Sequence, residues 1–338
     1  MAASRRTAAR YAAIAAVLAW TILAQSAPGQ ELPRTMLLAK AVREFGVRFE
    51  LTYGRVSLKV MRSIQTSTSS TSGPRRERFA IRAVGGDSSM EYELTTAEQQ
   101  ISIRFSGANQ LEIRRSPAGD LKLVAVEFNQ PATGPVSLKI GQQGARELRA
   151  ASLWHLLLAE PAECRQSLVP LLNLLQPKWE LEKTRDEIRA ILLRMAKSGS
   201  LPDQKRWAEW VQQLGDNRFA KREAADRQLR EAGRAAVAYL QQLDPSRLDA
   251  EQQYRVRRII QALTAGSGDD APEQIASWLF GDASVWLAML SGDEEPARKT
   301  AARQLGTLLG KPIQFDPAAD APTRKKQIEA LRAGISGK

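Results

Sequence analysis

The chain has one cysteine and one histidine among its 338 residues. With Cys164 alone no intramolecular disulfide can form, so the stability of the fold must come from packing. With His155 alone, zinc sites that use several imidazoles are excluded within one chain. A Ser-His-Asp triad could use only His155, which lies in an amphipathic run. A nucleophilic Cys-His pair is disfavoured, because the nine-residue spacing would place His155 and Cys164 on opposite faces of one continuous helix and Pro161 breaks that helix; a buried structural thiol is expected instead.

Other motifs that carry chemistry are also missing. There is no Walker loop and no calcium-binding loop, and Gly266-Ser267-Gly268 follows an expected helix rather than a strand, which is not the order of a dinucleotide site. The acidic runs Asp269-Asp270 and Asp293-Glu294-Glu295 fall in turns and at helix starts, where the helix dipole favours acids. The sequence therefore predicts no catalytic, cofactor-binding or metal-binding residues, no cofactor, and a protein that is not an enzyme.

The first 26 residues have the order of a secretory signal peptide. Arg5, Arg6 and Arg10 precede an uncharged apolar run at 11–24, and small residues follow. The run is shorter than the roughly 20 residues that span a bilayer. We expect cleavage after Ser26, export to the periplasm or beyond, and no stable membrane insertion afterwards. An uncleaved anchor and a twin-arginine signal are the alternatives.

Residues 31–144 are predicted to form an antiparallel β-meander with a covering helix. The stretch 33–45 has a helical apolar stripe, and apolar residues then alternate at 47–53 and 56–60. Further short alternating runs are separated by turn signals and lie at 78–84, 90–94, 101–105, 111–115, 121–128 and 136–140. The Ser/Thr tract at 66–72 has no apolar residue, so we expect a mobile loop there.

Arginines are frequent in this segment and suggest a basic outer face of the sheet: Arg75, Arg76, Arg78, Arg82, Arg104, Arg114 and Arg115. Binding of nucleic acid would need exposed aromatic residues among them. Phe79, Phe105 and Phe128 instead follow the apolar alternation and are expected in the core, and glutamates are mixed with the arginines. We expect a solvated face and no nucleic-acid partner; an anionic partner is the alternative.

The rest of the chain is predicted to be helical. Residues 145–197 form a connector of helices at 145–159, 162–175 and 178–197, the second kinked at Pro170. A break at 198–202 precedes further helices up to residue 334. The six tryptophans beyond residue 26 lie at helical spacing and are expected in the core.

An internal repeat organises the C-terminal part. At an offset of 76 residues, Trp210, Leu214 and Arg222 match Trp286, Leu290 and Arg298. The run Ala225, Arg227, Gln228 and Leu229 matches Ala301, Arg303, Gln304 and Leu305 in the same way. The offset is about twice the roughly 40 residues of a two-helix repeat unit.

The pattern L-G-D-x-R-F-x-x-R-E-A-A-x-x-x-L at 214–229 resembles a HEAT repeat, and residues 290–305 resemble it again. The tail at 310–333 is similar to the closing segment of HEAT-like proteins exported by certain bacteria. The resemblance covers 203–334 and implies an α-solenoid in which Asp216 and Arg222 can pair between stacked units. Residues 265–271 are expected to be the most flexible linker within this stack.

The fold class predicted is α+β: a meander with its helix, then the connector and a HEAT-like stack. We expect an exported bacterial scaffold or interaction module that binds a protein partner through the repeat surface. A carrier of an apolar or anionic ligand in the sheet domain is the alternative, and a hydrolase is the least favoured function. The identity of the partner and the oligomeric state stay open.

Overall fold

A computed structural model describes residues 36–118, 123–141, 146–198, 204–241, 243–264 and 269–336. These residues belong to one compact unit, Thr35–Lys338. The predicted signal peptide at 1–26 lies outside the described residues. Within them, no helix combines the length and the apolar character needed to cross a bilayer.

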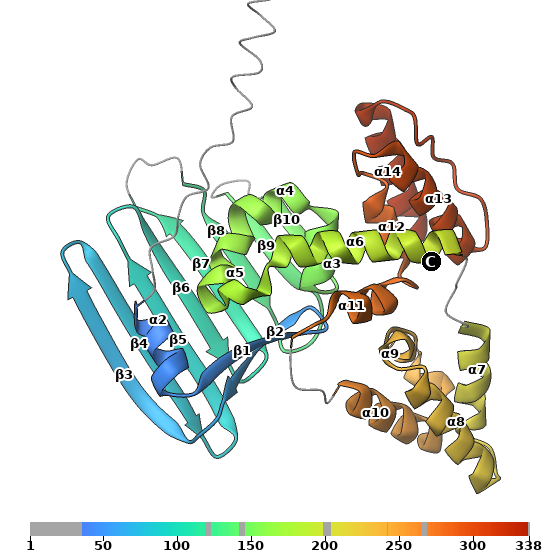
Figure 1. Ribbon diagram of the computed structural model, residues 1–338, viewed down its shortest axis with the longest axis horizontal. Coiled ribbons are helices and arrows are strands. Elements are labelled where there is room, and N and C mark those ends of the chain that lie inside the picture. The colour runs from blue at the N-terminus through green and yellow to red at the C-terminus, as the bar shows by residue number, and fades with distance from the viewer. Residues whose placement is uncertain are drawn as a thin grey trace, which may run out of the picture. The chain divides into compact units, whose positions relative to one another are not determined.

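The described chain is mixed: one short helix leads into ten strands, and helices follow them (Figure 1). The N-terminal elements are α2 (Met36–Glu44), β1 (Val47–Thr52), β2 (Arg55–Val60), β3 (Ile64–Ser72), β4 (Arg75–Val84), β5 (Asp87–Thr95), β6 (Gln99–Ser106), β7 (Gln110–Pro117), β8 (Val126–Gln130), β9 (Val136–Ile140) and β10 (Arg146–Ala150). The helical elements are α3 (Leu153–Ala159), α4 (Pro161–Glu163), a π-helical turn (Cys164–Leu168), α5 (Val169–Leu175), a 3₁₀ turn (Pro177–Trp179), α6 (Leu181–Ser198), α7 (Gln204–Gln213), α8 (Phe219–Glu231), α9 (Arg234–Gln241), α10 (Ala250–Thr264), α11 (Pro272–Leu279), α12 (Ala283–Met289), α13 (Glu295–Leu309) and α14 (Ala321–Ser336).

Strands β3 to β10 form an antiparallel meander of eight strands in sequence order. The alternation of apolar residues sets the register, because a slip by one residue would turn every apolar side chain to the other face. One row of paired residues crosses the sheet, and its central members are fully buried: Phe79, Tyr92, Ile103, Ile113, Phe128 and Leu138. Phe105 is buried on the same face, so the three phenylalanines predicted in the core are confirmed there.

Helix α2 and the β1–β2 hairpin cover this apolar face (Figure 1). Two buried polar side chains fix them in place. The carboxylate of Glu77 accepts hydrogen bonds from the N–H groups of Met36 and Leu37 at the start of α2. The amide of Gln130 accepts from the N–H of Val56 and donates to its carbonyl, at 2.9 and 2.8 Å. Buried polar groups are costly unless paired, so these bonds specify how the cover docks.

The opposite face carries charges of both signs in neighbouring strands. Arg104 lies 3.9 and 3.7 Å from Glu91 and Glu93, and Lys139 lies 3.7 Å from Glu127. Two of the arginines expected on this face belong to the other one. Arg115 is buried and donates to the carbonyl of Val124, and Arg75 pairs with the buried Glu77.

Two segments differ from the sequence-based expectation. The Ser/Thr tract expected as a mobile loop is part of β3, which pairs with β4 over nine residues. The predicted helix at 145–159 begins with β10, which pairs with β9, and only 153–159 are helical. Both segments are edge strands, where backbone hydrogen bonds to one neighbour suffice and an apolar alternation is not required.

The connector helices pack against the end of the sheet and against one another. Near Pro170, where a kink or split was expected, the helical segment changes type without a break: a π-helical turn precedes α5, and Pro170 lies in the first turn of that helix. Proline has no N–H to donate within a helix, so a wider turn before it accommodates the missing bond.

The β1–β2 hairpin is tied to the C-terminal helices by Asp269 and Asp270. Asp270 accepts from the N–H groups of Tyr53 and Gly54 and from Trp154 Nε1, each at 2.8 Å. Asp269 accepts from the N–H of Leu51 and from Trp179 Nε1, again at 2.8 Å. Residues 265–268 of the expected flexible linker lie outside the described residues. We call the two carboxylates that follow them, with the groups they bind, the Asp269–Asp270 clamp.

We predict that Asp270→Asn lowers the free energy of unfolding by about 1–3 kcal/mol, because both carboxylate oxygens accept and an amide nitrogen would face a donor. Urea denaturation measures the change. Asp293→Asn, in the exposed turn between α12 and α13, is the control and should change the free energy of unfolding by less than about 0.5 kcal/mol. Equal effects of the two substitutions would contradict the role of the clamp.

Candidate interaction surface on the helical hairpins

Two helical hairpins correspond to the internal repeat. Helices α7 and α8 pack against each other, as do α12 and α13. The matched residues take equivalent places: Leu214 and Leu290 are fully buried, and so are Leu229 and Leu305. Ala225 and Ala301 are buried in the same way, since a small residue lets the two helices approach closely.

The repeated arginine makes the same contacts in both hairpins. Arg222 Nη1 donates to the carbonyls of Asp216 and Asn217, at 2.8 and 3.3 Å. Arg298 Nη1 donates to the carbonyls of Gly292 and Asp293, at 2.9 and 2.6 Å. Each pair of carbonyls lies in the turn before the arginine's helix, at the same offset of 76 residues. The arginine therefore satisfies backbone acceptors that the end of the preceding helix leaves without a partner.

The expected pairing of the Asp216 carboxylate with Arg222 between stacked units is not what the structure shows. The carboxylate of Asp216 accepts from the N–H of Arg218 and lies 3.0 Å from Lys221 Nζ, within its own hairpin. Arg222 uses the backbone oxygen of Asp216 instead, and its Nε lies 3.6 Å from Glu251 on α10. The link to the next helix is thus made by the arginine and a glutamate.

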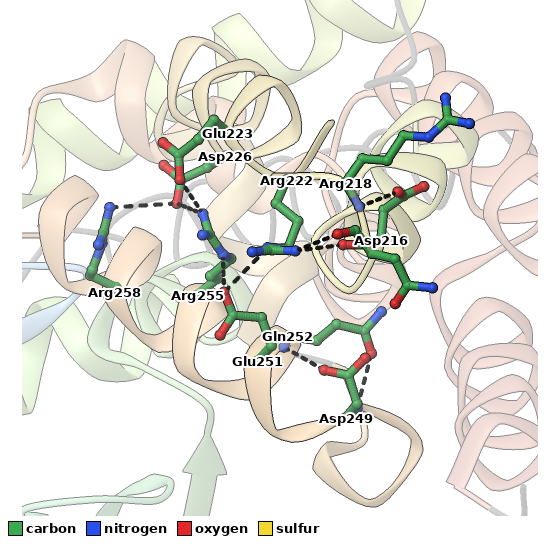
Figure 2. Close-up of polar contacts among 11 residues, drawn as sticks. Asp216, Arg218, Arg222, Glu223, Asp226, Asp249, Glu251, Gln252, Arg255 and Arg258 are labelled. Atoms are coloured by element: carbon green, nitrogen blue, oxygen red, sulfur yellow. Dashed lines mark hydrogen bonds and ion pairs between the residues drawn. The ribbon is translucent and has the colours of Figure 1, made fainter. Parts of the chain in front are cut away.

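A network of charged side chains joins α8 to α10 (Figure 2). Arg255 lies at its centre and is buried, with Nη1 2.8 Å from Glu223 and Nε 2.6 Å from Glu251. Asp226, also buried, lies 3.8 Å from Arg255 and 3.9 Å from Arg258. A buried charge is tolerated only when it is paired, so the network holds the two helices in one relative position.

The start of α10 is tied to α7. Asp249 and Gln252 exchange hydrogen bonds between their side chains and backbone N–H groups, which forms a capping box. Gln252 Nε2 also donates to the carbonyl of Val211 at 3.0 Å. A Cβ atom on Gly215 would lie 2.4 Å from the carboxylate of Asp249, so a larger residue here would displace that side chain. Helices α7, α8 and α10 therefore form a preorganised unit.

Two large side chains remain exposed beside this network. Phe219 is 64% exposed and Tyr254 is 54% exposed. Phe219 stacks under the Arg222 guanidinium, whose carbon lies 5.6 Å from the ring centroid. Tyr254 lies one helical turn from both Glu251 and Arg258 on α10. We call Phe219, Tyr254 and the charged side chains between them the α8–α10 surface.

The structure also brings together a Ser-His-Asp set that the sequence analysis considered only through its histidine. Ser152 Oγ lies 2.7 Å from His155 Nδ1, and His155 Nε2 lies 3.1 Å from Asp282 Oδ2. The order of groups is that of a hydrolytic triad, but the ring nitrogens are exchanged, since Nδ1 faces the serine and Nε2 the aspartate. Access differs as well: Ser152 is 2% exposed, and a Cβ atom on Gly54 would lie 2.6 Å from its oxygen. The backbone of the hairpin turn covers the hydroxyl, so a substrate has no room to reach it.

The Ser152–His155–Asp282 set holds α3 and α12 in place. His155 is on α3 and Asp282 precedes α12, where its carboxylate also accepts from the N–H of Ser284. Burial opposes ionisation of Asp282, but the hydrogen bond and charge of His155 and the bonds from Ser284 outweigh it and lower the pKa of Asp282 to about 2. The hydrogen bond between His155 and Asp282 therefore fastens α12 to α3.

The remaining candidate groups are inert in their surroundings. Cys164 is buried and its thiol donates weakly to the carbonyl of Leu156. Burial, followed by the charges of Glu160 and Glu163, raises the pKa of this thiol to about 12, which disfavours the nucleophilic thiolate. Gly266-Ser267-Gly268 lies outside the described residues. Among the residues that are described, no three His, Cys, Asp or Glu side chains gather as a metal ion would require.

Comparison of the chain with protein-family models, curated proteins and solved structures finds no match.

We predict that protonation of Asp282 destabilises the fold in acid. Because the pKa of Asp282 is lowered from 3.8 to about 2, its stabilising contribution is complete above about pH 4 and is lost as the pH falls toward 2. The contribution is about 2 kcal/mol. Urea denaturation at intervals from pH 5 to 2 should show a shallower loss of stability for Asp282→Asn than for the wild type. Asp87→Asn, at an exposed position at the start of β5, should keep the wild-type slope.

The second prediction concerns the repeated arginine. Arg298→Met should lower the free energy of unfolding by about 2 kcal/mol, because three carbonyls, those of Gly292, Asp293 and Pro317, lose a charged donor. Thermal or urea denaturation measures this change. Lys299→Met, on the exposed side of the same helix, is the matched control and should stay within about 0.5 kcal/mol of the wild type. A loss of similar size in the control would refute the assignment.

Proposed function

We propose that the chain is an exported bacterial scaffold that is not an enzyme and binds a protein partner through the α8–α10 surface of HEAT-like repeats. The observation that carries the proposal is the exposure of Phe219 and Tyr254 beside a charge network centred on the buried Arg255. Aromatic residues and arginines dominate the binding energy of protein interfaces when they are held in place before binding.

The assignment to HEAT-like repeats is supported by the shared contacts of the two hairpins. Arg222 and Arg298 bind equivalent turn carbonyls, and the same apolar positions are buried in both. In repeat proteins each unit contacts its neighbours and leaves one face for binding. Helix α10, which is joined to α8 by Arg255, fits the place of a neighbouring unit.

Two observations favour a binding module over the other functions considered. The Ser152 hydroxyl is buried under Gly54, which weighs against a hydrolase that would use His155. The apolar face of the sheet is filled by its own side chains and by the β1–β2 hairpin, which weighs against a carrier with a cavity there. Export rests on the N-terminal sequence pattern, which has the order of a signal peptide.

The test compares binding by matched variants of the mature protein. Partners captured from the native envelope by the wild type are identified by mass spectrometry, purified, and titrated by calorimetry. Phe219→Ala with Tyr254→Ala should weaken binding at least tenfold, since such residues contribute about 2 kcal/mol or more when they anchor an interface. Met61→Ala with Val84→Ala removes exposed apolar side chains of the sheet region and should leave the affinity unchanged.

Circular dichroism should show that both double variants are folded. If the Phe219 and Tyr254 variant binds as tightly as the wild type, the α8–α10 surface is not the binding site.

A further inference from the structure

The eight-stranded sheet has two edges of different construction. One edge is β10, a strand of five residues. It carries three charged side chains, and Arg146 is engaged by Glu160 and Glu163 from the helices that follow. Short length, charge and a covering element are the devices by which proteins keep sheet edges from pairing with other chains.

The other edge, β3, has none of these devices among the residues that the structure describes. It is nine residues long and contains no charge, no proline and no glycine, in the sequence Ile-Gln-Thr-Ser-Thr-Ser-Ser-Thr-Ser. Its register with β4 is continuous from Ile64 to Ser72, so no bulge twists it away. In the part of the chain that the structure describes, β4 is its sole strand partner. Half of its backbone N–H and C=O groups therefore point away from the sheet.

The side chains of β3 make this edge complementary to itself. Two antiparallel copies that pair about Thr68 place Ser67 opposite Ser69 of the second copy, and Thr66 opposite Ser70. Such Ser/Thr pairs stabilise neighbouring strands by mutual hydrogen bonds, and no like charges meet. A two-fold axis also closes the assembly at two copies, since each chain uses its single β3 edge.

A peptide of another sequence would not be bound selectively at the β3 edge. Strand-binding domains gain specificity from pockets that take alternate side chains of the ligand. The small hydroxyls of β3 offer neither a pocket nor a charge. The arginines of β4, such as Arg78, do not prevent pairing of two copies: the two β4 strands would be three strand spacings apart, about 14 Å, beyond the Debye length at physiological salt.

We infer that β3 is an interface between two copies of this chain, paired antiparallel about Thr68 so that their sheets join into one. This surface is separate from the α8–α10 surface and leaves it free. The area that one strand pair buries is small for a permanent dimer, so the dimer is in equilibrium with monomer at micromolar concentrations.

The test uses charges of opposite sign on the outer face of β3, where Ser67 and Ser69 are exposed. Sedimentation velocity of the full mature chain from 1 to 200 µM, about the range for a weak dimer, should show a monomer–dimer equilibrium for the wild type. Ser67→Lys with Ser69→Lys should be monomeric throughout, and so should Ser67→Glu with Ser69→Glu. An equimolar mixture of these two variants should form a dimer again, because opposite charges then face each other.

Gln100→Lys with Ser102→Lys is the matched control, because these positions lie on the same face of the interior strand β6. It should dimerise like the wild type, and circular dichroism should show that all variants are folded. A wild type that stays monomeric at 200 µM, about the upper limit tested, overturns the inference. A lysine variant that dimerises as the wild type does, or two variants that fail to associate when mixed although both are folded, overturns it as well.

Discussion

The Asp269–Asp270 clamp is the contact on which the rest of the fold depends. The β1–β2 hairpin is a separate two-stranded sheet, and two strands alone are marginally stable in water. On one side the amide of Gln130 fastens it to the eight-stranded sheet. On the other side Asp270 accepts from its turn and from the indole of Trp154. The hairpin thus joins the sheet to the helices, and the two carboxylates fix the position of the hairpin relative to the helices.

The same region contains the Ser152–His155–Asp282 set. Gly54 lies in the hairpin turn, and its lack of a side chain lets the backbone pack directly on Ser152. Trp278 lies edge-on to both Tyr53 and His155, with ring centroids 5.6 and 5.5 Å apart. These polar groups are therefore enclosed and hold the hairpin and the helices in position.

Local periodicity was sufficient to predict much of the fold. The apolar alternation around Phe79 and Phe105 predicted the meander, and the repeat around Trp210 and Trp286 predicted two like hairpins. The Ser/Thr tract at 66–72 could not be recognised as a strand, because an edge strand needs backbone bonds rather than apolar side chains. Residues 146–150 have one strongly apolar residue, Leu148, and merge with the helical pattern that follows them.

The candidate surfaces depended on contacts that no local pattern contains. His155 meets Asp282 across 127 residues, and Arg255 meets Glu223 across 32. The sequence predicted the repeated arginine but not its acceptors, since backbone carbonyls leave no mark in composition. The exposure of Phe219 could not be predicted from the sequence either, because an aromatic residue in a helix is more often buried than exposed.

The separation of 216 residues between Gly54 and Asp270 has a consequence for how the chain matures. Contacts between distant segments form late, because closing a long loop costs entropy that short-range contacts do not pay. The first hairpin to leave the ribosome must therefore wait for nearly the whole polypeptide before its turn is secured. Until then it is held to the sheet alone, through contacts such as those between Val56 and Gln130, and a chain that ends before the aspartates would keep the hairpin in this half-docked state.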